Sequence, residues 1–427
     1  MGVPTLPPDP FLVRLRPPDD APVAPLGPAV NLRQAVTLAL QHNFAVLTAA
    51  DTVASARHTY GAVRAQFFPQ FTPRFQRGED TSLYGLDLRQ RLPWSGGSLT
   101  ASGAFVSEPR TDNPAPRRSD LNLTLTQPLL RGFGPNATFF DLRNSRRNRV
   151  SQERSFELTR QRVAVDVARA FYQVVQQRML LAVARQSLER SQGLEKASDA
   201  RLEVGLVSKL DVFRAQLQAS QAQESMIRSE AALQDALEDF RFLLGLAPSE
   251  PLEPEEVVLE AVLAADTLEP LAVLVDRALS QRLDLREVRD QVDDARRAAS
   301  LARQNLLPQI DLNVGVTQTG RGTSFGDALS TGDRRTEVSL SASYPLERSQ
   351  DRAVSAVANL DLDARARTLR QRELEIEGEV RSAVRELEQI RKSVDLQRVA
   401  VEVAEQQHRL ATLRYQRGLA SNFDVVD

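Results

Sequence analysis

The sequence contains no cysteine, and it has only three histidines among its 427 residues. Without cysteine these 427 residues can form no disulfide, thiolate metal ligand or cysteine nucleophile, and we expect no lipid anchor on an N-terminal cysteine. His42, His58 and His408 lie far apart in sequence, without the spacing of metal ligands. A glycine-rich phosphate loop followed by lysine is also missing. We therefore expect no catalytic residues, no metal site and no cofactor, and a protein that is not an enzyme.

The chain also lacks an excess of charge of either sign and a long apolar run. Lysine and arginine together number 54 against 56 acidic residues, which gives a formal net charge of −2 and no general attraction to nucleic acid. Only Lys196, Lys209 and Lys392 are lysines, a bias that is typical of a GC-rich genome rather than of a phosphate-binding surface. No apolar run approaches the ~18–20 residues of a membrane-spanning helix.

Proline, in contrast, is concentrated at the N-terminus, where residues 1–28 hold nine prolines. The basic, apolar and small-residue succession of a signal peptide does not occur there. We expect residues 1–30 to form an extended strap or a disordered arm. A trimmed mature chain and a cytoplasmic protein both fit this pattern.

The most informative feature is an internal repeat. Residues 31–76 align without a gap on residues 270–315, an offset of 239, and residues around Gly205 recur around Gly418 at an offset of 213. The fall from 239 to 213 means that the first copy carries 26 more residues between these points. We expect a first repeat over 31–245, an inter-repeat linker over 246–270 and a second repeat over 271–427.

Each copy predicts the same order of elements. A helix over 31–66 ends before Pro69 and Pro73, because proline lacks an amide donor. Alternating apolar residues then predict strands. These strands are expected around 83–88, 99–105 and 121–125 in the first copy, and around 310–316 and 338–342, on either side of a glycine-rich loop over 320–333, in the second.

Two long stretches without proline, 137–203 and 350–416, predict very long helices. A seven-residue apolar stripe with small residues beside it predicts close antiparallel packing. The stripe consists of Val167, Val174, Leu181 and Leu188 in the first copy and of Val380, Leu387, Val394 and Val401 in the second.

Glycines end both long helices, and Ser208 with Asp211 predicts the start of a returning helix over 209–245. In the second copy the sequence stops at Asp427, before the corresponding helix. We expect the natural chain to continue for about 40 residues, by analogy with the first copy.

This duplicated order resembles the TolC-like outer-membrane factors, also called outer membrane efflux proteins. The resemblance covers residues 31–427 and depends most on 201–206 with Asp211-Val212 and on 414–419 with Asp424-Val425. It implies an α+β membrane protein built from two internal repeats, with a long antiparallel coiled-coil α-barrel and a trimer-shared β-barrel. Each protomer would supply four strands to a shared barrel of twelve strands. The region 83–106 is an extra pair, which either lengthens the barrel strands or makes a separate hairpin.

The resemblance also implies function, partners and location. The chain would be a passive outer-membrane exit duct of a tripartite efflux pump or type I secretion system, extending into the periplasm. Its partners would be two further copies, a periplasmic adaptor (membrane fusion) protein, outer-membrane lipid and an inner-membrane pump of the RND, ABC or MFS type. Nucleic acid is not expected.

Specific residues match the family's tip. Val204, Gly205, Leu206, Gly418 and Leu419 would dock the adaptor. Asp424 and Asp427, one helical turn apart, would form an acidic ring at the entrance. Asp211 and Tyr415 match a latch pair, although Asp211 also fits a plain helix-start residue. These candidate residues are given by the resemblance and not by spacing alone.

One alternative from another class stays open. A soluble coiled-coil scaffold or periplasmic adaptor, whose strands form a small sandwich, also explains the long helices. It does not explain why strands precede both long helices at matched positions.

Overall fold

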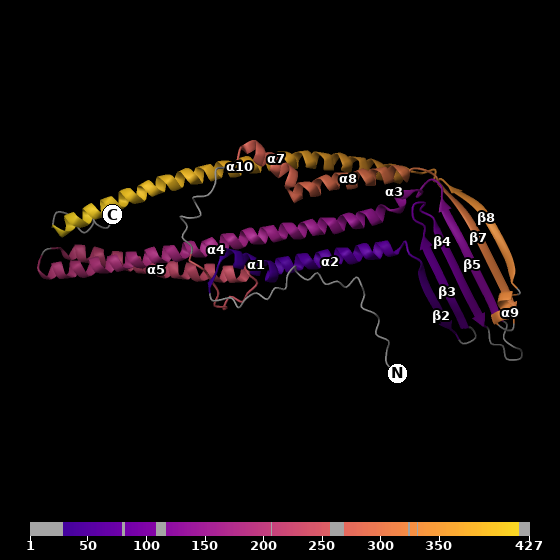
Figure 1. The fold of residues 1–427 in the computed structure, drawn as a ribbon, viewed down its shortest axis with the longest axis horizontal. Coiled ribbons are helices and arrows are strands. Elements are labelled where there is room, and N and C mark those ends of the chain that lie inside the picture. Colours follow the sequence, from indigo (N-terminus) through magenta and orange to yellow (C-terminus); the bar gives the residue numbers. More distant parts are fainter. Residues whose placement is uncertain are drawn as a thin grey trace. The chain divides into compact units, whose positions relative to one another are not determined.

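The computed structural model describes residues 29–78, 82–107, 117–205, 207–256, 269–322, 325–330 and 332–417 (Figure 1). The chain divides into two compact units. The sheet unit contains described residues from 51–155 and 282–374, and the helical unit contains those from 29–50, 156–281 and 375–417.

Matching helix pairs precede the strands of both copies. The first pair is α1 (Leu32–His42) and α2 (Phe44–Ala65), and the second is α7 (Leu271–Gln281) and α8 (Leu283–Gln304). Their lengths, 11 and 22 residues, are identical in the two copies, and all four boundaries differ by the offset of 239.

The single helix expected over 31–66 is wrong, because the structure breaks it at Asn43. The Asn43 backbone is extended, with ψ of 128°. Its side-chain oxygen accepts from the amide of Ala45 at 2.9 Å, and its side-chain nitrogen donates to the carbonyl of Leu243 at 2.8 Å. Asparagine side chains commonly compete with the helix for backbone groups in this way.

The sheet unit contains one antiparallel sheet with the order β2-β3-β4-β5-β7-β8. The strands are β2 (Gln70–Arg77), β3 (Ser82–Arg91), β4 (Ser98–Ser107), β5 (Arg117–Pro128), β7 (Gln309–Gly322) and β8 (Asp333–Ser343). The loop expected over 320–333 is shorter than predicted, since β7 extends to Gly322 and the short helix α9 (Phe325–Ser330) lies before β8.

The sheet corrects the expected four strands per chain to six. The strands β3 and β4 lie between β2 and β5. β3 pairs with β2, β4 pairs with β5, and β3 and β4 pair with each other. The region 83–106 therefore neither forms a separate hairpin nor lengthens other strands. It adds two strands to the same sheet.

Two very long helices follow the strands of the two copies. The helix α4 (Phe140–Glu203) has 64 residues and comes after the short α3 (Pro135–Thr138), while α10 (Ser349–Gln416) has 68 residues. The ends of α4 and α10 differ by 213 residues, the second offset of the repeat. Among the described residues, none of the helices combines the length and the apolar character needed to span a membrane.

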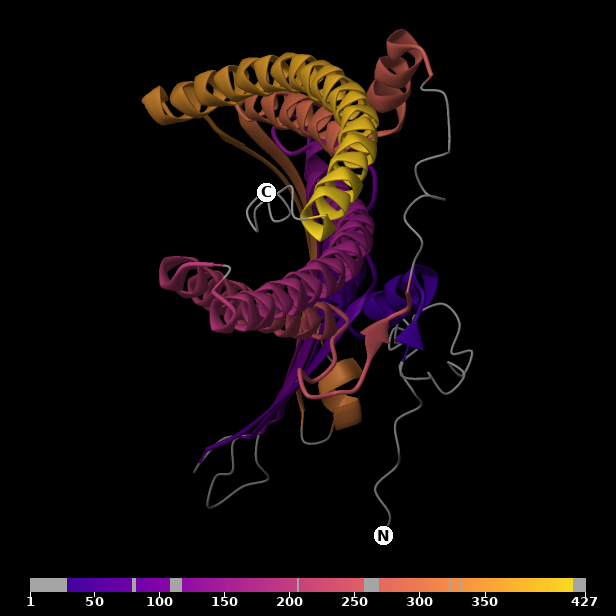
Figure 2. The same ribbon diagram turned by 90° about the vertical axis from the view of Figure 1, so that its left-hand side faces the viewer.

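The helical unit is centred on the packing of α4 against α5 (Lys209–Leu243), which runs back alongside it (Figures 1 and 2). The predicted stripe is confirmed here, because Val167, Val174 and Leu181 are buried. Phe171 and Phe240 are fully buried beside it, with ring centroids 6.1 Å apart. A two-residue pairing of β1 (Ala29–Val30) with β6 (Glu253–Pro254) covers the end of this core.

The corresponding stripe of α10 is different. Leu387 and Val401 are 39% and 57% exposed, whereas their first-copy counterparts Val174 and Leu188 are buried and half-buried. The described residues therefore leave the stripe of α10 more exposed than its counterpart in α4.

Candidate functional site

The first tip turn joins α4 to α5 through Gly205. This residue has φ of +73°, in the left-handed region that favours glycine, and its amide donates to the carbonyl of Leu202 at 2.9 Å. Val204 before it and Leu210 and Phe213 after it expose most of their apolar side chains. The turn thus presents apolar groups that the described part of the chain leaves exposed. Leu206 lies outside the described residues.

Asp211 takes part in a capping box at the start of α5. The Ser208 amide and hydroxyl donate to the Asp211 carboxylate at 3.1 and 2.7 Å, and the Asp211 amide donates back to the Ser208 hydroxyl at 3.3 Å. These hydrogen bonds from Ser208 hold the pKa of the Asp211 carboxyl below its usual value. The structure therefore gives Asp211 the helix-start role, which was one of its two predicted roles.

The second tip turn is largely outside the described part of the chain. The end of α10 contains the Tyr415 backbone, but the Tyr415 side chain is not among those described. Gly418, Leu419, Asp424 and Asp427 also lie outside the described residues. The acidic ring and the latch stay predictions.

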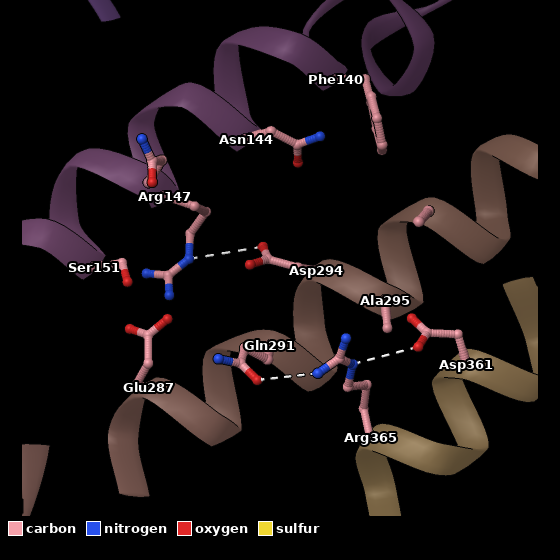
Figure 3. A pocket seen from close by; sticks show the side chains of 12 residues that line it. Phe140, Asn144, Arg147, Ser151, Glu287, Gln291, Asp294, Ala295, Asp361 and Arg365 are labelled. Carbon is pink, nitrogen blue, oxygen red and sulfur yellow. Dashed lines mark hydrogen bonds and ion pairs between the residues drawn. The ribbon is translucent and has the colours of Figure 1, made fainter. Parts of the chain in front are cut away.

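A groove in the sheet unit lies where the first turns of α4 meet α8 and α10 (Figure 3). Its volume is about 460 Å³, and polar side chains from all three helices line it. Asn144 and Arg147 come from α4, Gln291 and Asp294 from α8, and Arg365 from α10. Arg365 donates to the Gln291 side-chain oxygen at 3.4 Å and also contacts Asp361 at 3.4 Å.

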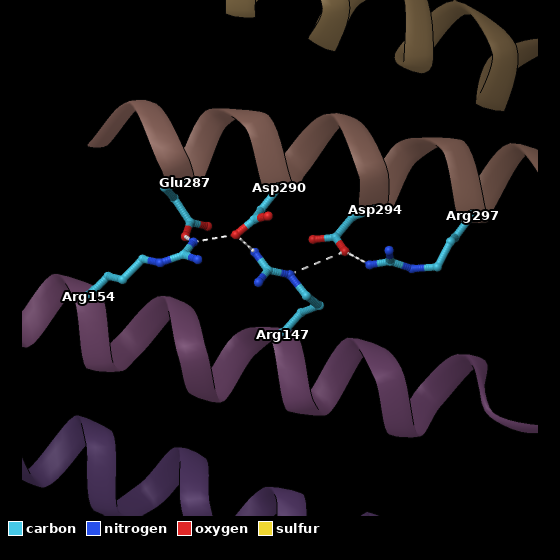
Figure 4. A network of polar contacts seen from close by, with 6 residues as sticks. All are labelled: Arg147, Arg154, Glu287, Asp290, Asp294 and Arg297. Atoms are coloured by element: carbon cyan, nitrogen blue, oxygen red, sulfur yellow. Dashed lines mark hydrogen bonds and ion pairs between the residues drawn. The ribbon is translucent and has the colours of Figure 1, made fainter. Parts of the chain in front are cut away.

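An ion-pair network fixes α4 to α8 beside this groove (Figure 4). Asp290 is its centre, since Arg147 approaches its carboxylate at 2.5 Å and Arg154 pairs with the same oxygen. Arg154 also reaches Glu287 at 3.3 Å, and Asp294 pairs with Arg297 and lies 3.7 Å from Arg147. Burial raises the pKa of the Asp294 carboxyl against the opposing effects of Arg297 and Arg147.

This network was not predicted from the sequence, although the spacing of its residues is visible there. Glu287, Asp290 and Asp294 are spaced three and four residues apart, which places them on one helical face. Arg147 and Arg154 are seven residues apart, which also keeps them on one face. The spacing does not predict that the acidic face of α8 and the basic face of α4 contact each other. The network therefore links α4 to α8.

A second charged cluster joins α8 to α10. Arg282 and Arg372 contact the same oxygen of Asp284 at 2.7 and 2.8 Å. The hydrogen bond from Arg282, supported by that from Arg372, holds the pKa of the Asp284 carboxyl well below its usual range. Within the described ranges, no group of three or more histidine, aspartate or glutamate side chains is placed to hold a metal ion.

The sheet has two chemically different faces. Residues that are directly opposite each other on neighbouring strands point to the same face of the sheet. The strand registers therefore show which residues of all six strands share one face. That face is mostly apolar, with Gln318 and Arg334 as polar exceptions, and many of its side chains are exposed. It includes Phe71, Phe75, Tyr84, Leu86, Leu88, Phe105, Leu121, Leu123, Val314, Val316, Val338 and Leu340.

The opposite face is polar. It includes Arg74, Asp87, Ser102, Asn122, Thr124, Asn313, Glu337, Ser339 and Ser341. An exposed apolar face of this extent is unusual for a water-soluble sheet and typical of a surface that contacts lipid or protein. The polar face is suited to contact with water.

Comparison with solved structures identifies the fold. The structure is similar to CusC (17% identity, TM-score 0.69, covering 93% of this chain and 85% of CusC). It is also similar to the outer membrane channel CmeC of Campylobacter jejuni (16% identity, TM-score 0.69, covering 93% of this chain and 79% of CmeC). A third similar structure is the outer membrane protein VceC of Vibrio cholerae (15% identity, TM-score 0.69, covering 92% of this chain and 88% of VceC). These chains show that the fold is that of the TolC-like channels. A sequence search among curated proteins finds no match.

The family model for outer membrane efflux proteins matches residues 35–246 and 274–427. The match covers most of the chain and includes both copies of the repeat. It includes α2, α8, the six strands and both long helices, and all but the first three residues of α1 and α7. The chain therefore belongs to the outer membrane efflux protein family.

Proposed function

We propose that this protein is the passive outer-membrane exit duct of a tripartite efflux pump or type I secretion system. Small molecules or polypeptides would pass through it from the periplasm to the exterior. Family membership makes it a protein of the outer membrane with a periplasmic extension. Conduction through such a duct needs no covalent chemistry.

The observation that carries this proposal is the apolar face of the six-stranded sheet. In lipid every backbone polar group needs a partner, so a sheet that faces lipid must have closed edges. Within the described sheet, β2 and β8 each pair on one side only. Further copies of the chain would close these edges into a barrel, and the family resemblance favours a homotrimer. The same apolar face argues against a soluble scaffold.

The membrane role is tested by reversing the character of one face. Leu123 lies on the apolar face near the middle of β5, and Thr124 lies next to it on the polar face. We expect Leu123→Arg to destabilise the inserted protein by about 2–4 kcal/mol and to reduce its amount in outer membranes, because arginine would face lipid. Retention after a high-salt wash, with release by detergent, measures insertion.

Thr124→Arg is the matched control, since it places the same side chain on the water-facing surface. We expect it to insert normally and to form conducting channels in planar bilayers. If the unmodified protein is recovered in the soluble fraction, or if both variants insert equally well, the membrane assignment of this face is wrong.

We also propose that the tip turns dock the periplasmic adaptor, which connects the duct to an inner-membrane pump. Exposed Val204, Leu210 and Phe213 support this role for the first turn, together with Gly205. By resemblance, Leu206, Gly418 and Leu419 complete the surface. Asp424 and Asp427 of three copies would surround the entrance, where a ring of carboxylates favours cations.

A latch between Asp211 and Tyr415 is the proposal for the resting state. Asp211 lies in the first turn of α5, just after the first tip turn, and Tyr415 belongs to the last turn of α10. We expect Tyr415→Phe, which removes only a hydroxyl group, to raise the leak conductance in a planar bilayer. Asp211→Ala should have the same effect.

Ser208→Ala separates the latch from the helix cap. It removes the capping partner of Asp211, at a cost of about 1 kcal/mol, but keeps the Asp211 carboxylate and Tyr415. We expect little change in leak conductance from this control. Unchanged conductance in both latch variants would remove the latch from this proposal.

A further inference from the structure

The two copies of the repeat differ by one complete hairpin. Gln70 begins β2 and Gln309 begins β7 at the offset of 239. The corresponding Pro-Leu pairs are Pro128-Leu129, at the end of β5, and Pro345-Leu346, just after β8. These points lie 58 residues apart in the first copy (128 minus 70) and 36 in the second (345 minus 309). The difference of 22 residues is close to the two ten-residue strands β3 and β4.

The inserted hairpin is a full member of the sheet. All eight residues of β2 pair with β3, and all ten residues of β4 pair with β5. The Arg74 guanidinium also contacts the Asp87 carboxylate at 2.5 Å, which joins β2 to β3 on the polar face. The edge of β2 that faces the rest of the sheet is therefore occupied by β3 and is not free to pair with β5.

The hairpin also continues the apolar face of the sheet. Tyr84, Leu86 and Leu88 of β3 extend the apolar face between Phe71 of β2 and Leu121 of β5. Gly103 of β4 lies opposite Leu121, and a Cβ atom on Gly103 would come within 3.1 Å of the Leu121 side chain. The inserted strands are thus fitted to the same lipid-facing surface.

We infer that the β3–β4 hairpin widens the membrane part of the duct. The inference rests on the proposed trimeric duct: three copies of a six-stranded sheet make eighteen strands, where four per copy would make twelve (Figure 1). Barrel diameter grows roughly in proportion to strand number, so the barrel is about 1.5 times as wide, and barrels of 16–18 strands leave an aqueous channel. With its polar lining, this end of the duct admits bulky hydrophilic solutes, including polypeptides.

The full-length trimer tests this inference directly, by electron cryo-microscopy in lipid nanodiscs. We expect eighteen strands with β3 and β4 in the wall. A twelve-stranded trimer with the hairpin outside the wall overturns the inference but leaves the proposed duct intact. A particle without a membrane barrel overturns both.

A cross-link supplies a second readout on the same chain, because the sequence has no natural cysteine. Thr72 and Asp87 are directly opposed on β2 and β3, within the Cα separation that a disulfide accepts. We expect T72C/D87C to form an intramolecular disulfide in outer membranes. The control T72C/S102C should not, because Ser102 lies one strand further away. Failure of T72C/D87C to oxidise in membrane-inserted trimers contradicts the inference.

Deletion of residues 82–107 measures the consequence for cargo. We expect the shortened protein, where it inserts, to exclude polyethylene glycols from the outer side at a hydrodynamic diameter about 1.5 times smaller than the full chain does. An equal exclusion size in two conducting proteins counts against a wider barrel. Imaging and cross-linking keep the inference testable if this variant does not fold.

Discussion

Replacement of Phe171 by alanine is expected to destabilise the helical unit by about 3–5 kcal/mol, the largest effect of any single substitution considered. Phe171 is fully buried where α4 packs on α5, and its ring lies edge-on to those of Tyr172 and Phe240. Truncation leaves a cavity inside a buried cluster that also contains Val167, Val174 and Leu237. The surrounding backbone is rigid helix and can collapse only in part.

Hydrogen exchange followed by mass spectrometry measures this effect locally, since exchange reports the opening of individual segments. Protection of amides near 163–175 and 237–244 should fall by about two to three and a half orders of magnitude, at about 1.4 kcal/mol for each tenfold change. Phe242→Ala is the matched control, because Phe242 belongs to the same helix as Phe240 but is 61% exposed. A similar loss of protection in both variants would show that Phe171 is not central to the core.

Replacement of Asp290 by alanine is expected to cost about 2 kcal/mol and to loosen α8 from the first turns of α4. Arg147 and Arg154 both depend on the Asp290 carboxylate, and its side chain is 27% exposed. Without the Asp290 carboxylate, the two half-buried guanidinium groups keep their desolvation cost but lose an ion-pair partner. This estimate is below the range for fully buried pairs, because water still reaches the site.

Asp293→Ala provides the control for Asp290→Ala, since it makes the same chemical change on the same helix. Asp293 is 56% exposed and pairs only at the surface with Arg296, so we expect a cost of about 0.5 kcal/mol. Thermal unfolding in detergent and hydrogen exchange of the peptides from α8 distinguish the two variants. Equal destabilisation would mean that the network does not hold the helices together.

Local patterns account for most of the predicted elements. The proline at position 69 and the glycine at position 205 end helices through their own backbone properties, and so the ends of α2 and α4 were predictable. The stripe through Val167 and Val174 predicted its own burial, because a seven-residue apolar spacing needs a neighbouring helix.

The errors concern contacts between residues distant in sequence. The helix break at Asn43 depends partly on the Leu243 carbonyl, 200 residues away, which no local pattern reveals. The Asp290 network likewise needs two charged faces from different copies of the repeat. The tip candidates came from resemblance, and Asp211 shows why resemblance leaves roles open, since its carboxylate is engaged in a helix cap.

The sequence by itself determined the duplication, the long helices, the tip turn and the alternating faces of the strands. Each of these follows from periodicity or from the backbone chemistry of single residues, so no distant contact is needed to define it. Only the tertiary structure decided that β3 and β4 enter the sheet between β2 and β5. Alternation fixes which side chains share a face, whereas hydrogen bonding between distant segments fixes which strands are neighbours.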